Sequence, residues 1–277
     1  MIPQALALPQ QFLAGGLGML ADEGDSHFPP SVNDFYFPSL FDPRYYPWLT
    51  KFTLLVWFAV ALILVFFLVG YRNPKIVPGR WQWMTESLYG FARNNIATEM
   101  IGARGVNFAP YFTTLLSFLL LTNLFGILFP IQISPNSHIA FPAMLAVVSY
   151  VMFNYVGIRQ HGFVKYMKLA LIPPAPWFIL PILIPIELAS TFIIRPFTLA
   201  LRLFANMFAG HIILLVFTLG GFALLGAQTV AIRPLSIVSW VMAIALTFLE
   251  TLVAVLQAYV FVVLTASYVG GALAEEH

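Results

Sequence analysis

Long uncharged apolar runs alternate with short polar segments along most of the chain. The first run, 52–71, has twenty residues without a charge. At about 1.5 Å of rise per residue, such a helix crosses about 30 Å of hydrocarbon. Between Arg104 and Arg159 no residue is charged, but this stretch is broken into two crossings by Pro130, Pro135, Asn136 and Ser137. The pattern predicts an all-α membrane protein with about five spans, at roughly 50–72, 106–130, 139–158, 177–222 and 234–272.

The last two predicted spans are the longest. The fourth is long enough to tilt in the membrane, and a short turn at Arg233 and Pro234 separates it from the fifth. Helices joined by a short connection pack antiparallel. We therefore expect the last two helices to form a long hairpin.

The segment 80–104 has a different pattern. Trp81, Met84, Leu88 and Phe91 recur at steps of three or four residues, and charged side chains fall between them. This periodicity is typical of an amphipathic helix lying in the membrane interface. A short cytoplasmic helix packed on protein is the alternative.

Composition agrees with a chain surrounded largely by lipid. Hydrophobic residues make up 60% and charged residues only 9%, and the mean hydropathy is +0.88, which excludes an ordinary soluble globular protein. The balance of 13 basic and 11 acidic residues gives no argument for nucleic-acid binding. The absence of cysteine excludes disulfides and thiolate metal sites. No cofactor and no metal site is predicted.

The basic residues predict the orientation of the chain. Lysine and arginine mark short cytoplasmic loops, and they gather after the first and the third predicted span. These residues are Arg72, Lys75, Arg80, Arg93 and Arg104, then Arg159, Lys165 and Lys168. The N-terminus is therefore expected outside and the C-terminus in the cytoplasm. A multi-pass protein of a bacterial plasma membrane is the favoured location, with an organelle as the alternative.

Two regions follow from this topology. Residues 1–47 form an extracytoplasmic N-terminal segment, and 48–277 form the integral membrane domain. Met1–Ala21 is mildly apolar but has no basic start, so a cleaved signal peptide is not favoured.

Ionisable side chains at membrane depth cost about 2.5–3.5 kcal/mol each on insertion scales and mark functional pathways. Two amides accompany the candidates. The set is Glu187, Arg195, Arg202, His211 and Glu250, with Asn206 and Gln257. An antiparallel register centred near residue 230 places Arg202 level with Gln257 and His211 level with Glu250. Glu187 would lie near the cytoplasmic edge.

This layout predicts two half-paths for protons with a barrier between them. A histidine and a carboxylate exchange protons near neutral pH, whereas an arginine stays charged and cannot relay a proton. No carboxylate of the chain is expected level with Arg202, so a partner must supply one. The alternatives are a lipid headgroup at Arg195, a purely structural His211–Glu250 pair, and amides that only join helices.

These polar residues lie in stretches that closely resemble subunit a of the F-type ATP synthase, the stator of the membrane sector. The matching stretches are 185–188 (PIEL), 195–211 (RPFTLALRLFANMFAGH), 250–261 (ETLVAVLQAYVF) and the terminal 275–277 (EEH). The resemblance implies that Arg202 is the essential arginine facing the carboxylates of the c-ring. It also implies that His211, Glu250, Asn206 and Gln257 line the access paths.

One position departs from the family pattern. Glu187 stands one residue further from Arg195 than the usual acid of the family does. Either the helix accommodates an extra residue, for example in a π-bulge, or the carboxylate has moved round the helix. The role of Glu187 in the inner path depends on which of these holds. Arg195 is a further candidate, as a support.

The resemblance also implies the partners. They are the c-ring, a b-type subunit of the peripheral stalk, the remaining ATP synthase subunits and membrane lipid, without nucleic acid. The chain has no glycine-lysine phosphate loop, so nucleotide chemistry would belong to other subunits. A stand-alone proton-coupled secondary transporter is the main alternative, and a haem-bearing respiratory subunit is a further one.

Overall fold

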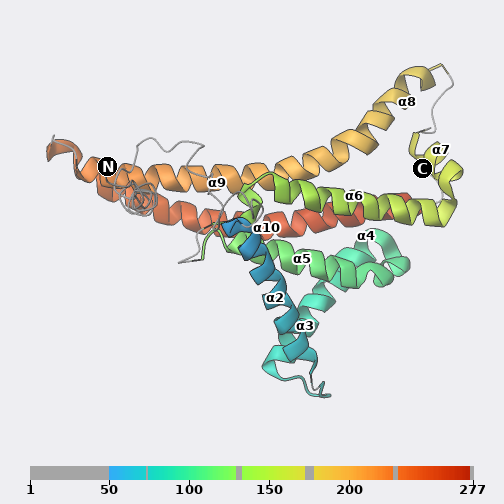
Figure 1. The fold of residues 1–277 in the computed structure, drawn as a ribbon, viewed down its shortest axis with the longest axis horizontal. Coiled ribbons are helices and arrows are strands. Elements are labelled where there is room, and N and C mark those ends of the chain that lie inside the picture. The colour runs from blue at the N-terminus through green and yellow to red at the C-terminus, as the bar shows by residue number, and fades with distance from the viewer. Residues whose placement is uncertain (1–49, 73, 129–132, 172–177, 227–229, 275–277) are drawn as a thin grey trace, which may run out of the picture. The chain divides into compact units, whose positions relative to one another are not determined.

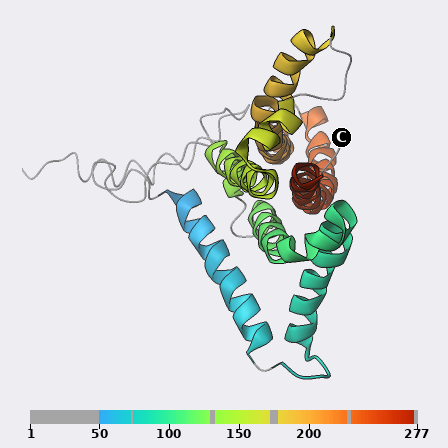
Figure 2. The same cartoon turned by 90° about the vertical axis from the view of Figure 1, so that its right-hand side faces the viewer.

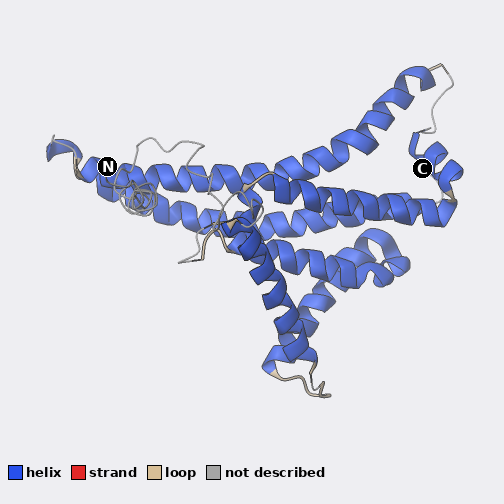
Figure 3. Cartoon of the chain, in the orientation of Figure 1, coloured by secondary structure: helices blue, strands red, loops and turns tan. Residues whose placement is uncertain are grey.

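The computed structural model describes residues 50–72, 74–128, 133–171, 178–226 and 230–274. Within these ranges every regular element is a helix and no strand occurs (Figure 3). The predicted N-terminal segment 1–47, Pro130 and the terminal 275–277 lie outside the described residues.

Figure 1 shows the helices in chain order. Their bounds are α2 Lys51–Tyr71, α3 Arg80–Phe91, α4 Glu99–Ile101, α5 Ala109–Leu124, α6 Ala140–His161, α7 Phe163–Leu171, α8 Leu180–Ala189, α9 Arg195–Leu225 and α10 Leu235–Leu273. Short π- and 3-10 helices join several of them, at Ala92–Thr98, Gly102–Phe108, Pro135–Ser137, Ser190–Ile194 and Val230–Ile232.

Five helical stretches are long and apolar enough to cross a membrane. They are Lys51–Tyr71, Arg80–Leu124, Ala140–His161, Leu180–Leu225 and Leu235–Leu273. This confirms the predicted all-α class with five spans. The segment 80–104 runs on into α5 through a π-helix and a 3-10 helix, and its location in the interface stays a prediction.

The chain divides into two compact units. The described part of the first is Ile212–Ile244, where α9 ends and α10 begins. There the Ser239 hydroxyl donates to the Phe217 carbonyl at 2.6 Å. The rings of Phe222 and Trp240 meet edge to face at 5.3 Å between centroids. These contacts show the antiparallel pairing of α9 and α10 within this unit.

The second unit contains the main core. Figure 2 looks along α5, α6, α9 and α10, which run together. They contribute most of its buried apolar residues, including Phe112, Leu119, Phe153, Leu203 and Phe261. Small residues let the helix backbones approach, as is common in membranes. Ala254, Ala258 and Ala266 supply these small faces on α10.

Helices α2 and α3 in the same unit join through a short turn (Figure 2). The Gln82 side chain accepts from the Lys75 amide and donates to the Lys75 carbonyl, each at 3.0 Å. Gly70 allows close approach, because a Cβ there would lie 2.5 Å from the Thr85 side chain. The amide clamp and the missing Cβ define how these two helices meet.

The π-helix Ser190–Ile194 interrupts the long helix between Glu187 and Arg195. Pro196 follows it, and proline has no N–H for the helix and crowds the carbonyl four residues earlier. A wider turn at this point relieves that crowding. Of the two arrangements considered for Glu187, the structure therefore has the one with an accommodated extra residue.

Candidate functional site

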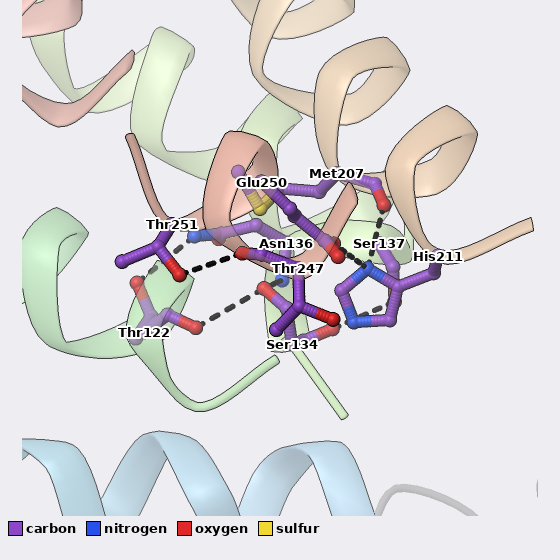
Figure 4. Close-up of polar contacts among 9 residues, drawn as sticks. All are labelled: Thr122, Ser134, Asn136, Ser137, Met207, His211, Thr247, Glu250 and Thr251. Carbon is purple, nitrogen blue, oxygen red and sulfur yellow. Dashed lines mark hydrogen bonds and ion pairs between the residues drawn. The ribbon is translucent and has the colours of Figure 1, made fainter. Parts of the chain in front are cut away.

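His211 of α9 and Glu250 of α10 form a buried pair (Figure 4). The imidazole Nδ1 lies 2.8 Å from Glu250 Oε1 and also 2.8 Å from the Met207 carbonyl oxygen. A carbonyl can only accept, so Nδ1 carries a hydrogen. One N–H cannot point at both oxygens; the hydrogen-bond geometry favours Met207, and Oε1 keeps the electrostatic contact.

The other ring nitrogen of His211 is the open position of this pair. Nε2 is buried and has no hydrogen-bond partner among the described residues. With the hydrogen on Nδ1, Nε2 of the neutral ring has a free lone pair. A proton can therefore add at Nε2 while Nδ1 faces the carboxylate.

Two glycines make room for the pair. A Cβ on Gly126 would lie 2.5 Å from His211 Cε1 and 2.7 Å from Nε2. A Cβ on Gly210 would lie 2.9 Å from Glu250 Oε1. Real Cβ contacts are essentially never this short, so a side chain at Gly126 would displace the imidazole and one at Gly210 would displace the carboxylate. Sequence reasoning missed Gly126, because a turn glycine 85 residues before His211 gives no local signal.

A buried polar cluster lies beside His211, where α5 ends and the 134–137 loop follows (Figure 4). The Asn136 amide donates to Asn123 Oδ1 at 2.7 Å and to the Thr122 hydroxyl at 2.9 Å. The Ser134 hydroxyl donates to the Thr122 carbonyl at 3.1 Å. Asn123 also donates to the Ala254 carbonyl of α10 at 3.0 Å. Sequence reasoning used Asn136 only as a helix breaker, although its place in an uncharged apolar run was the available signal.

Gln257 bonds with Asn206 rather than with Arg202. Asn206 Nδ2 donates to Gln257 Oε1 at 2.7 Å. Side chains on a helix tilt toward its N-terminus, so on antiparallel helices each side chain meets a partner displaced along the neighbour. This shifts the Gln257 contact one turn along α9, away from the level of Arg202.

Arg202 is exposed on α9, on the same surface as Asn206. In the part of the chain that the structure describes, no carboxylate forms an ion pair with it. Leu203, the next residue, is fully buried, so the backbone here is packed while the guanidinium points outward. That another chain supplies the acid facing Arg202 stays a prediction.

Glu187 and Arg195 meet at a cavity of about 310 Å³. Arg195 Nη2 lies 3.6 Å from Glu187 Oε1, and both side chains are about one-third exposed. His161, Tyr166 and Tyr268 also line the cavity. Burial raises the pKa of the Tyr166 phenol, Tyr150 adds to the rise, and the positive charge of Arg195 opposes it.

The candidate residues thus fall into three groups in the structure. His211 and Glu250 form one, Arg202 with the Asn206–Gln257 pair forms the second, and Glu187 with Arg195 forms the third. Within the described ranges no three His, Cys, Asp or Glu side chains are grouped as metal ligands.

Comparison with known proteins gives the family. The family model described as ATP synthase A chain matches residues 53–270. A protein named ATP synthase subunit a from a Nocardioides species is 46% identical over 209 residues, covering 74% of this chain and 75% of the relative. A protein of the same name from a Parafrankia species is 49% identical over 207 residues, covering 74% of this chain and 69% of the relative. Another, from Frankia alni, is 45% identical over 212 residues, covering 76% of this chain and 72% of the relative.

Proposed function

Since the chain belongs to the ATP synthase subunit a family, a multi-pass membrane component that works with other ATP synthase subunits, we propose that it passes protons to and from a rotating c-ring. In this role it is the stator of the membrane sector and provides two half-channels. The N-terminus lies outside and the C-terminus in the cytoplasm, as the basic loops indicate.

The exposed Arg202 carries this proposal. A guanidinium at membrane depth is costly unless it finds a partner, and its own chain offers no carboxylate within the described residues. A ring of carboxylates passing along this surface would satisfy it. Because arginine cannot lose its proton, it stabilises an ionised carboxylate and prevents a direct proton leak between the half-channels.

His211 and Glu250 serve the outer half-channel. A proton from the outer side adds at His211 Nε2. A small rotation of the imidazolium then redirects the Nδ1 hydrogen from the Met207 carbonyl to Glu250 Oε1, 2.8 Å from Nδ1, and the proton transfers to the carboxylate. The imidazole is left neutral with its proton on Nε2. It returns to the starting tautomer when Nε2 gives up this proton to water and Nδ1 takes one up. The protonated Glu250 side chain then transfers this proton toward the c-ring.

Glu187 serves the inner half-channel. Glu187 lies on α8 and lines the cavity of about 310 Å³ near the start of α9, whereas His211 lies in the middle of α9. A ring carboxylate that has completed its rotation gives up its proton on this side, with Arg202 stabilising the anion. A stand-alone transporter is not favoured, because Arg202 is exposed and forms no ion pair with a carboxylate among the described residues, which favours an acid on a second chain.

The test is ATP-driven proton pumping in inverted membrane vesicles, followed with a pH-sensitive dye. Arg202→Ala should abolish pumping while the complex stays assembled. Arg159→Ala is the matched control, because Arg159 is also an exposed arginine, near the end of α6. Undiminished pumping by an assembled Arg202→Ala complex would refute the proposal.

A further inference from the structure

Three side chains converge where α8 leads into α9. Arg195 Nη2 lies 3.6 Å from Glu187 Oε1, and Arg195 Cζ lies 5.5 Å from the centre of the Tyr268 ring. All three line the cavity of about 310 Å³. The guanidinium therefore stands between a carboxylate and an aromatic face.

The π-helix Ser190–Ile194 brings the two charges onto one face. At 100° per residue, eight steps of a regular α-helix would leave Glu187 and Arg195 about 80° apart. A π-turn takes one extra residue, so the pair is in phase as if seven residues apart, within about 20°. The π-turn thus places both side chains on the same face of the helix, where they can form the ion pair.

Tyr268 fixes the position of Arg195. Cations are attracted to the face of an aromatic ring at this distance. The Tyr268 ring in turn packs against Phe153, with 5.8 Å between centroids, and Phe153 is buried in the core of the unit. Arg195 is thereby tied to a rigid part of α10.

We propose that Arg195 is a positioning residue of the inner half-channel: anchored over Tyr268, it holds the Glu187 carboxylate at the cavity wall, where that carboxylate accepts the proton released by the partner's acid. This inference rests on the function proposed above. It differs from lipid binding by Arg195, in which Glu187 would have no part.

A double-mutant cycle tests the dependence of one residue on the other. ATP-driven pumping is compared in assembled complexes carrying Arg195→Gln, Glu187→Gln or both. Arg195→Gln should slow pumping about fivefold in the parent, with little further loss in the Glu187→Gln background. Arg195→Lys should retain most of the rate, because it keeps the charge. Arg159→Gln, a change of the same chemistry near the end of α6, is the control and should have no effect.

The aromatic anchor gives a second, independent measurement. Tyr268→Leu removes the ring and should reproduce the loss of Arg195→Gln, whereas Tyr268→Phe keeps the ring and should recover most of that loss. The proposal would be overturned if Arg195→Gln caused the same fold-loss of pumping in the parent and in the Glu187→Gln variant. It would also be overturned if neither Arg195→Gln nor Tyr268→Leu changed pumping. Arg202→Ala is measured alongside. If it abolishes pumping while Arg195→Gln acts independently of Glu187, the positioning role fails and the stator function stands.

Discussion

Replacing Gly126 with alanine is a direct test of whether the His211 ring must occupy its observed place. The new Cβ would lie 2.5 Å from Cε1 and 2.7 Å from Nε2 of the imidazole. The ring has little freedom to move, because Nδ1 donates to Met207 and contacts Glu250, each at 2.8 Å. Ser134 adds to the crowding, with its Cβ 3.2 Å from the same point.

The expected cost follows from overpacking a filled site. Adding a methyl group to a packed interior costs about 1–3 kcal/mol. If the ring relieves this strain by leaving Glu250, the productive arrangement is depopulated by about 5- to 150-fold, at 1.4 kcal/mol per factor of ten. Proton pumping should fall within that range while ATP hydrolysis and assembly of the complex persist.

The assay is acidification of inverted vesicles at matched amounts of assembled complex. Gly90→Ala is the control, because a Cβ at Gly90 meets nothing within 4 Å. Pumping by Gly126→Ala equal to that of Gly90→Ala would show that the imidazole does not need this position. The reasoning from the Gly126 contact to the proton path would then be wrong.

Two further tests address the pair and the helix phase. The double variant His211→Glu/Glu250→His should pump faster than either single variant, because an imidazole and a carboxylate are again in contact. If the double variant pumped no faster than the slower single variant, the two residues would not act as a pair. Deleting exposed Ile193 from the π-helix should preserve pumping, since the helix can become α-helical and keep Glu187 in phase with Arg195. Deleting exposed Phe197 from α9 should abolish pumping, because Glu187 and Arg195 would turn by about 100° relative to Arg202. Equal pumping by the two deletion variants would contradict this argument.

The all-α class and the number of spans could be predicted from the chain because a bilayer imposes a length on each crossing. Uncharged runs of that length are visible without any knowledge of packing. The approach of His211 to Glu250 was also predictable, since a short turn defines the register of two antiparallel helices. These features depend on distances along the chain or on one hairpin.

The remaining features depend on contacts between segments far apart in sequence. Gly126 and Asn136 reach His211 and its surroundings through the packing of α5 against α9 and α10, which no local pattern encodes. The partner of Gln257 depends on the tilt of side chains across the helix pair. For the extra residue between Glu187 and Arg195, two arrangements were consistent with the sequence, and the structure has the one with a π-helix at Ser190–Ile194. Hydrophobic length specifies where a helix crosses the membrane, but the position of a proton-binding atom depends on how side chains fill the space between helices.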